Sequence, residues 1–261
     1  MKDKTILDCE SVETTYNSLE RILGVTRQSM EKVFQDFDID RYYTLNPNSY
    51  DRPNELLLSK VLSSDQLDIE FDCVCWFHLT RTVQTNKFEE GILPLNKAIN
   101  LIWDFLYALV DQELDLNEWN KLKLDYMASP PLNSAFSKLI GEPTYGPYAV
   151  LVREGAFRWR ELSNHDYLGV PEAVEDFSYP FEKRYKIDLL RRFKENTRPC
   201  IVKFIDDRVY PGLIGCALYY LYTVYRGFKF SHLCTTNFCG QNEVIGKNRI
   251  LKIEFPDILE E

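Results

Sequence analysis

The chain has 261 residues, of which 45% are hydrophobic and 27% are charged. These are ordinary values for a globular protein and exclude wholesale disorder. The formal net charge of −9 argues against a general binder of phosphate backbones, because such proteins gather lysine and arginine on one face.

The longest apolar stretch, LIGCALYYLYTVYRGF (213–228), is shorter than the roughly 18 apolar residues needed to cross a bilayer. It predicts a buried helix. The N-terminus is acidic where a signal peptide would be apolar, and the seven cysteines are odd in number and lie mostly within apolar runs. Reduced cysteines behave as small hydrophobes, so we expect a cytoplasmic protein without a membrane association.

The first part of the chain is predicted to be helical. Residues 11–37 carry apolar side chains at a spacing of three and four, which is typical of one face of a helix. Asparagine, proline and aspartate cluster at 43–53 and break this pattern, and NELLLSKVLSS (54–64) predicts a further helix. We therefore assign residues 1–66 to a helical N-terminal subdomain.

The character of the sequence changes from Ile69. IEFDCVCWFHLTRT (69–82) is rich in β-branched and aromatic residues and predicts a central strand. NKFEEGI (86–92) predicts a short helix that ends at Gly91. A long helical region is predicted at 95–127 and another helix at 129–141, which has a capped start and a glycine at its end.

Strands return in the last part of the chain. YGPYAVLVREGAF (145–157) and RPCIVKFIDD (198–207) predict strands, and 210–226 predicts a helix. The tail at 242–259 alternates around a turn at GKN and predicts a terminal β-hairpin. The expected fold class is α+β, with the helical N-terminal region on a mixed, mainly antiparallel β core at 67–261.

Metal binding is not predicted, although cysteine and histidine lie close together in two places. Cys73 and Cys75 have one residue between them, whereas structural zinc sites usually have two. In a strand these cysteines share one face and His78 points to the other. FSHLCTTNFC (230–239) has no zinc spacing either. The patterns G-x-x-x-x-G-K, G-x-G-x-x-G and G-x-S-x-G are also absent.

Charged stretches have structural explanations. KRYKIDLLRRFK (183–194) is rich in leucine and isoleucine and predicts an amphipathic helix with a solvated charged face. Pro171, followed by Glu172 and Glu175, predicts the first turn of a helix, where negative charge suits the helix dipole.

Two short motifs carry a family resemblance. In FHLTRTVQTNKFEEGILPL (77–95), His78 lies on a strand, Thr80 follows two residues later, and F-x-x-G-I leads to Gly91. CGQNEVIGKNRILKI (239–253) contains Gln-x-Glu, followed by residues that favour strands. The first motif resembles the ADP-ribosyltransferase superfamily, in the branch with poly-ADP-ribose polymerases and DNA-modifying bacterial toxins. The second resembles a turn that is commoner in another branch.

The resemblance implies an α+β core at 67–261 of this family and NAD as the bound substrate, without a metal. It implies catalytic roles for Glu243, as the carboxylate that polarises the nicotinamide ribose, and for Gln241, which orients the acceptor. It also implies cofactor-binding roles for His78 and for the Thr80 and Arg81 region. Tyr148 is the expected aromatic that stacks on nicotinamide, and Tyr145 is the rival for that role.

These residue types suit the chemistry that the resemblance implies. Departure of nicotinamide builds positive charge on the ribose, and a positioned carboxylate stabilises this charge most where water is excluded. An aromatic face and an imidazole fix the leaving group for attack by the acceptor. We expect an enzyme that modifies a protein or a nucleic acid, of the kind found among toxins and antiphage effectors.

Other interpretations stay open. His78 is also explained as a core histidine bonded to a backbone group, and Glu243 as a turn residue. The aromatic content of 14%, together with the acidic charge, is typical of a non-enzymatic interaction or inhibitor protein with an aromatic-rich binding surface. A domain that keeps the fold and has lost its catalytic groups is a third alternative. The sequence does not predict the oligomeric state.

Overall fold

The structure is a computed structural model that describes residues 4–62, 69–128 and 146–258. It confirms the predicted α+β class, with a mainly antiparallel sheet. The strands are β1 (Ile6–Leu7), β2 (Cys73–Thr82), β3 (Tyr148–Val150), β4 (Arg198–Asp206), β5 (Asn237–Cys239) and β6 (Ile250–Glu254). The α-helices are α1 (Val12–Leu23), α2 (Arg27–Asp36), α3 (Ile39–Leu45), α4 (Pro53–Val61), α5 (Leu95–Ala108), α6 (Leu116–Ala128), α8 (Trp159–Leu162), α9 (Glu172–Tyr185), α10 (Leu189–Asn196) and α11 (Gly212–Arg226).

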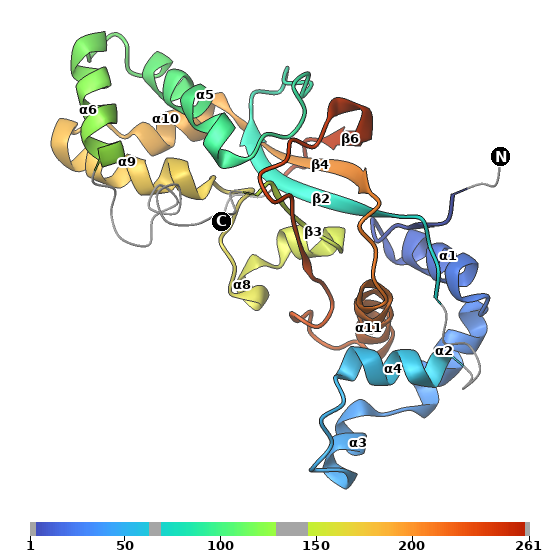
Figure 1. Cartoon of the computed structure of the whole chain (residues 1–261). Coiled ribbons are helices and arrows are strands. Elements are labelled where there is room, and N and C mark those ends of the chain that lie inside the picture. The colour runs from blue at the N-terminus through green and yellow to red at the C-terminus, as the bar shows by residue number, and fades with distance from the viewer. Residues whose placement is uncertain (1–3, 63–68, 129–145, 259–261) are drawn as a thin grey trace. The chain divides into compact units, whose positions relative to one another are not determined.

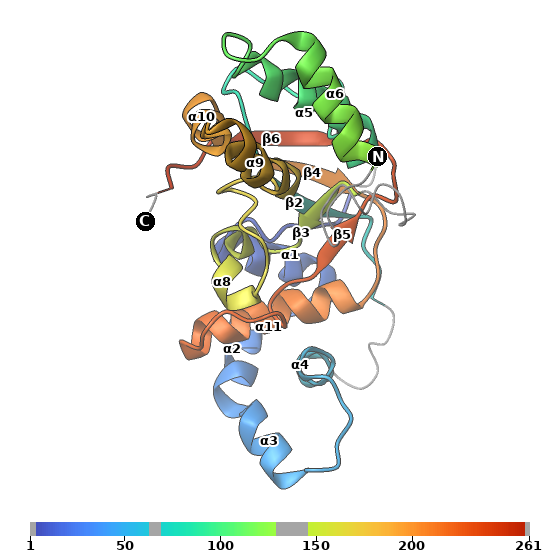
Figure 2. The ribbon, with the colours of Figure 1, turned by 90° about the vertical axis from the view of Figure 1, so that its left-hand side faces the viewer.

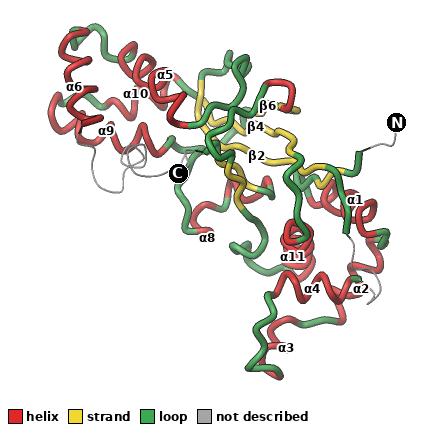
Figure 3. Tube along the Cα trace, viewed as in Figure 1, coloured by secondary structure: helices red, strands yellow, loops and turns green. Residues whose placement is uncertain are grey.

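The strands, drawn in yellow in Figure 3, form one sheet in the order β5-β3-β2-β4-β6, and β1 also pairs with β2. β1 runs parallel to β2, with Ile6 opposite Cys73, and β3 runs antiparallel to β2, with Phe77 opposite Val150. The predicted central strand at 69–82 is confirmed as β2. The predicted strand at 198–207 is confirmed as β4.

The chain divides into two compact units, each built from separated segments. Unit 1 comprises residues 1–77, 149–164 and 203–238, and unit 2 comprises 78–148, 165–202 and 239–261. This division differs from the boundary that we placed after residue 66. The first helices pack against α11, and β1 pairs with β2, so they share a core with later parts of the chain.

In unit 1, α11 is the helix on which the core is built, and α1, α2 and α4 all pack against it (Figure 1). Its side chains at Leu213, Leu218 and Leu221 are fully buried, which confirms the buried helix predicted there. A Cβ on Gly215 would lie 3.1 Å from the backbone oxygen of Asn54. The small residue therefore allows α4 to approach α11 closely.

In unit 2, aromatic rings from α5, α6 and α9 form a second core. The rings of Trp103 and Phe177 meet edge to face with centroids 4.3 Å apart, and Trp119 meets Phe177 at 5.6 Å. Such pairs contribute about 0.5–1.5 kcal/mol beyond the burial of their area. The helices α5 and α6 lie side by side, as do α9 and α10 (Figure 2).

Two predictions about local structure are wrong. Residues 86–92 form turns and not a helix, because the Asn86 side chain accepts a hydrogen bond from the amide of Phe88 (2.8 Å) and Phe88 has a φ of 51°. Such asparagine bonds compete with helix formation. The tail is not a hairpin, because Ile245 pairs with Ile92 and β6 pairs with β4.

Other elements are shorter than expected. The strand predicted at 145–157 is limited to β3 and is followed by a 3-10 turn at Arg153–Phe157. A second 3-10 turn, Lys247–Arg249, precedes β6. The long helical region at 95–127 divides into α5 and α6, and α9 begins directly after Pro171 as predicted. The helix predicted at 129–141 and Tyr145 lie outside the described residues.

Replacing Leu221 by alanine should destabilise unit 1, because it removes a fully buried side chain from α11 and leaves a cavity. The expected loss in the free energy of unfolding is about 2–5 kcal/mol. The measurement is urea denaturation followed by circular dichroism. Val224→Ala on the same helix is the control, since Val224 is 41% exposed, and an equal loss in both variants would contradict the packing described.

Candidate functional site

The described residues of the predicted site all belong to unit 2. His78 and Thr80 lie on β2, two residues apart, so their side chains share one face of the strand. Tyr148 begins β3, and Gln241 and Glu243 follow β5. These three groups of residues are far apart in the sequence, and backbone hydrogen bonds show which of them lie close together in the fold.

His78 is tied to the backbone of Tyr148. Its Nδ1 lies 2.7 Å from the carbonyl oxygen of Tyr148, and because a carbonyl only accepts, Nδ1 carries the proton in this bond. Burial lowers the pKa of His78 below its ordinary value, and the hydrogen bond opposes this shift. The imidazole is therefore neutral at pH 7, and Nε2 has a lone pair that can accept a hydrogen bond.

The Gln-Asn-Glu turn contacts the same backbone segment. The amide of Gly240 donates to the carbonyl of Pro147 and the amide of Asn242 donates to the carbonyl of Gly146, both at 2.9 Å. Gln241 and Asn242 have φ angles of 51° and 71°. The segment 146–148 is thus bonded both to His78 and to the turn, so the two motifs contact the same three residues through its backbone.

A second contact joins the two motifs. Ile92 and Ile245 exchange backbone hydrogen bonds of 2.9 and 3.1 Å, and Lys247 forms an ion pair with Glu89. Gly91 has a φ of 80°, and a Cβ at this position would lie 2.2 Å from the carbonyl oxygen of Ile245. Only glycine allows this approach, which explains in steric terms why a glycine ends the F-x-x-G-I motif here.

The accessible groups of the site are the tyrosine ring and the turn. Tyr148 is 48% exposed, and both Gln241 and Glu243 are exposed. The backbone amide of Glu243 donates a hydrogen bond to the carbonyl of Gly240 (2.9 Å). Glu243 is therefore also a turn residue, which was the alternative explanation of this residue in the sequence. A carboxylate in water stabilises a developing charge less than one in a dry site.

Arg81 has a structural position. It is 7% exposed, and its guanidinium donates to the hydroxyl and carbonyl of Thr197 and to the carbonyls of Leu168 and Lys194, at 3.1–3.3 Å. Strand alternation places Arg81 on the face of β2 opposite to His78. The spacing of these two residues in the sequence already indicated this, and our prediction of a shared site did not use it. We therefore leave Arg81 out of the cofactor-binding set. Thr80 is half-buried.

Two further residues near Tyr148 were missed as functional candidates. The pKa of Tyr167 is raised to about 12 by burial and then by the charge of Glu172, with which its hydroxyl also forms a hydrogen bond. Tyr148 is among the groups that act on the same pKa. The sequence predicted Glu172 as a helix-dipole residue, and the loop that contains Tyr167 has no motif to mark it.

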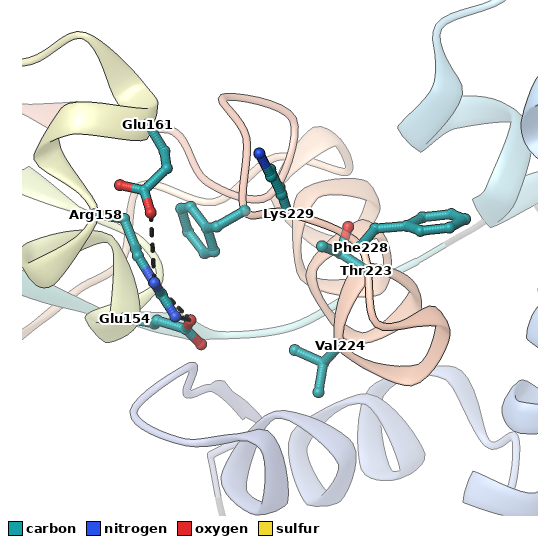
Figure 4. A pocket seen from close by; sticks show the side chains of 8 residues that line it. Glu154, Arg158, Glu161, Thr223, Val224, Phe228 and Lys229 are labelled. Carbon is teal, nitrogen blue, oxygen red and sulfur yellow. Dashed lines mark hydrogen bonds and ion pairs between the residues drawn. The ribbon is translucent and has the colours of Figure 1, made fainter.

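A pocket of about 410 Å³ lies in unit 1 and is lined by none of the predicted site residues (Figure 4). Arg158 lies on one wall and pairs with Glu154 at 2.9 Å and Glu161 at 3.4 Å. Lys229 also lines the pocket, so the lining has two carboxylates and two basic groups, and its balanced formal charge gives no preference for an anion or a cation. Its remaining wall comes from the C-terminal part of α11 and the residues that follow, with Thr223, Val224, Phe228, Lys229 and Phe230.

Within the described ranges, no group of three or more histidine, cysteine or carboxylate side chains is placed to hold a metal. No helix among these residues has the length and apolar content required to span a bilayer. Comparisons with protein-family models, with curated proteins and with solved structures found no match to this chain.

His78 should titrate below its ordinary pKa of 6.5, which an NMR pH titration of the ring would measure. Because the folded pKa is lower than the unfolded one, the unfolded chain binds the proton first as the pH falls. The stabilisation that comes from the neutral imidazole of His78 is therefore fully present above pH 6.5. It is lost as the pH falls through the folded pKa.

His78→Asn is the control for this titration, since its side-chain amide can donate to the carbonyl of Tyr148 and does not titrate. This variant should lose less stability than the wild type between pH 7 and pH 5. A ring pKa above 6.5 would contradict the burial described for His78.

Replacing Gly91 by alanine should destabilise unit 2 and remove protection of the Ile92 amide from hydrogen exchange, because the new Cβ displaces the carbonyl of Ile245. Gly24→Ala is the matched control, since Gly24 has a φ of 65° and no atom within 4 Å of its Cβ position. That variant should cost only the backbone strain, about 1 kcal/mol. Equal losses of stability in the two variants would show that the contact with Ile245 is not tight.

Proposed function

We propose that the chain is an ADP-ribosyltransferase-like enzyme that uses NAD to modify an acceptor. The observation that supports this most is the segment 146–148. Its backbone bonds to His78 and to the Gly240–Glu243 turn, and it therefore links the histidine, the tyrosine and the carboxylate that the family resemblance selects. These residues come from three separate parts of the sequence.

The side chains around this segment fit NAD chemically. Nε2 of His78 can accept a hydrogen bond from a ribose hydroxyl, because Nδ1 is held by the carbonyl of Tyr148. The half-exposed ring of Tyr148 can stack on the nicotinamide ring, whose positive charge is attracted to an aromatic face. Thr80 shares the β2 face with His78 and completes the proposed cofactor-binding set.

The proposed reaction breaks the bond between the ribose C1′ and the pyridinium nitrogen of NAD. Nicotinamide leaves with the electron pair as a neutral molecule, and the acceptor bonds to C1′ and loses a proton to water. Glu243 faces the positive charge that develops on the ribose, and Gln241 orients the acceptor. Because both side chains are exposed, we expect bound substrate to exclude water from Glu243 before the reaction.

An interaction protein is the second candidate, and an apolar surface near the end of α11 favours it. Val224, Tyr225 and Phe228 are 41%, 42% and 46% exposed. Val224 and Phe228 also line the unit 1 pocket. Exposed aromatic residues are enriched at protein interfaces. A function that resides on this surface would survive the loss of every residue in the unit 2 site.

The test of the enzyme is release of nicotinamide from NAD by the purified chain, with host lysate and nucleic acid as acceptors. Glu243→Gln should lower the turnover by about a hundredfold or more, because it removes the charge that stabilises the transition state. Glu90→Gln is the matched control, since Glu90 is an exposed glutamate of the same unit and its loss should leave the turnover unchanged.

Absence of both nicotinamide release and NAD binding would contradict the proposed function and favour the interaction protein. Release that continues unchanged in Glu243→Gln would place the catalytic carboxylate elsewhere. NAD binding should weaken in Tyr148→Ala if the ring stacks on nicotinamide, and calorimetry without an acceptor measures this effect separately from turnover.

A further inference from the structure

The unit 1 pocket has two walls that contact each other directly. The segment 153–162 supplies one wall, and the end of α11 with the residues after it supplies the other (Figure 4). The hydroxyl of Tyr220 on α11 donates to Oε2 of Glu154 (3.1 Å). A Cβ on Gly155 would lie 3.7 Å from the ring of Phe230, which also meets the ring of Tyr220 edge to face. These contacts hold the two walls together without a ligand.

One carboxylate of the pocket keeps open acceptor positions. Arg158 donates twice to Oε1 of Glu154, at 2.9 and 3.1 Å, and the Tyr220 hydroxyl takes the other oxygen. Arg158 reaches Glu161 only through Nη1 at 3.4 Å, which is long for a hydrogen bond between charged groups. Within the described ranges, Oε2 of Glu161 has no donor. The negative charge of Glu161 is therefore only weakly compensated.

Lys229 supplies a cation from the other wall. The backbone amide of Phe228 donates to the carbonyl of Thr223 (2.9 Å), and Gly227 has a φ of 65°. Bonds of this kind close a helix that ends in glycine, and they fix the chain direction just before Lys229. Its ammonium forms no ion pair or hydrogen bond with another residue that the structure describes. The pocket thus has an open anion on one wall and an open cation on the other.

Apolar side chains complete the pocket. Val224 and Phe228 are 41% and 46% exposed, and Phe230 is buried. An apolar ligand group that covers these side chains removes apolar area from water, which favours binding. The volume of about 410 Å³ lies in the range of small-molecule sites, roughly 300–1,000 Å³. The lining therefore suits a small ligand that combines an apolar body with charged groups.

We propose that this pocket binds an apolar amino acid, free or in a dipeptide, with its ammonium group at Glu161 and its carboxylate at Lys229. A simple anion would leave Glu161 without a cation, and a simple cation would leave Lys229 without an anion. A zwitterion compensates both charges at once. The proposal does not rest on the NAD reaction, because the candidate residues for that reaction belong to unit 2.

The test is a series of NMR titrations of the full chain in the absence of NAD. L-phenylalanine and L-alanyl-L-phenylalanine supply the zwitterion in two lengths, so their relative affinities distinguish a free amino acid from a dipeptide. Phenethylamine has only the ammonium group, 3-phenylpropionate has only the carboxylate, and N-acetyl-L-phenylalanine amide has neither. The tighter zwitterion should bind at least about threefold more strongly than each of these three compounds.

Two variants assign the charges of the ligand. Glu161→Gln should weaken the binding of the zwitterion and of phenethylamine about threefold to tenfold, and should not weaken that of 3-phenylpropionate. Lys229→Gln should weaken the zwitterion and 3-phenylpropionate, and should not weaken phenethylamine. Both side chains are exposed, and circular dichroism establishes that each variant is folded. Lys32→Gln is the matched control, since Lys32 is an exposed lysine of the same unit, and it should bind every compound as the wild type does.

Failure of both zwitterions to bind the wild type would overturn the proposal. Equal affinity for the zwitterions and for N-acetyl-L-phenylalanine amide would also overturn it, because the pocket would then recognise the apolar body alone. A loss in Glu161→Gln that is the same for all five compounds would contradict an ammonium position at this residue. The expected charge dependence would support the site whether or not the chain releases nicotinamide from NAD.

Discussion

A buried guanidinium organises unit 2. Arg81 donates to the carbonyls of Leu168, Lys194 and Thr197 and to the hydroxyl of Thr197. Lys194 belongs to the last turn of α10, where helix carbonyls lack partners within the helix and a positive charge complements the dipole. Burying the charge costs solvation free energy, and these bonds offset that cost. Without Arg81, the strand, the helix end and the loop before α9 would each lose their shared partner.

The alternation of β2 separates this structural role from the proposed chemical one. Arg81 is on one face and His78 and Thr80 are on the other, because successive side chains of a strand point to opposite sides. The same strand therefore fixes α10 with one face and supplies the candidate site with the other. Arg81 also bonds to the carbonyl of Leu168 in the loop before α9, so its role is one of positioning the backbone around β2.

The sequence predicted the elements whose patterns are local and long. The buried helix at α11, the strands β2 and β4 and the start of α9 after Pro171 follow from apolar periodicity, β propensity and capping. One failure comes from a competing side-chain bond close in the chain, and the other from a strand partner that is distant in the chain. Asn86 bonds the amide of Phe88 and prevents a helix, and Ile245 pairs with Ile92 instead of closing a hairpin. Neither a competing side-chain bond nor a remote strand partner leaves a periodic signal.

The candidate site has the same limitation: short motifs identify some of its residues, and others lie in segments without a motif. His78 and Glu243 were selectable from short motifs, because their neighbours in sequence resemble a family pattern. Tyr167 and Glu172 have no such neighbours, and only the fold places the charge of Glu172 where it helps to raise the pKa of Tyr167. The two carboxylates also differ in environment, since Glu243 is exposed and Glu172 is half-buried. Carboxylates in different surroundings can take different roles in one reaction. In the proposed reaction, Glu243 therefore acts on the developing charge only when the substrate has covered it.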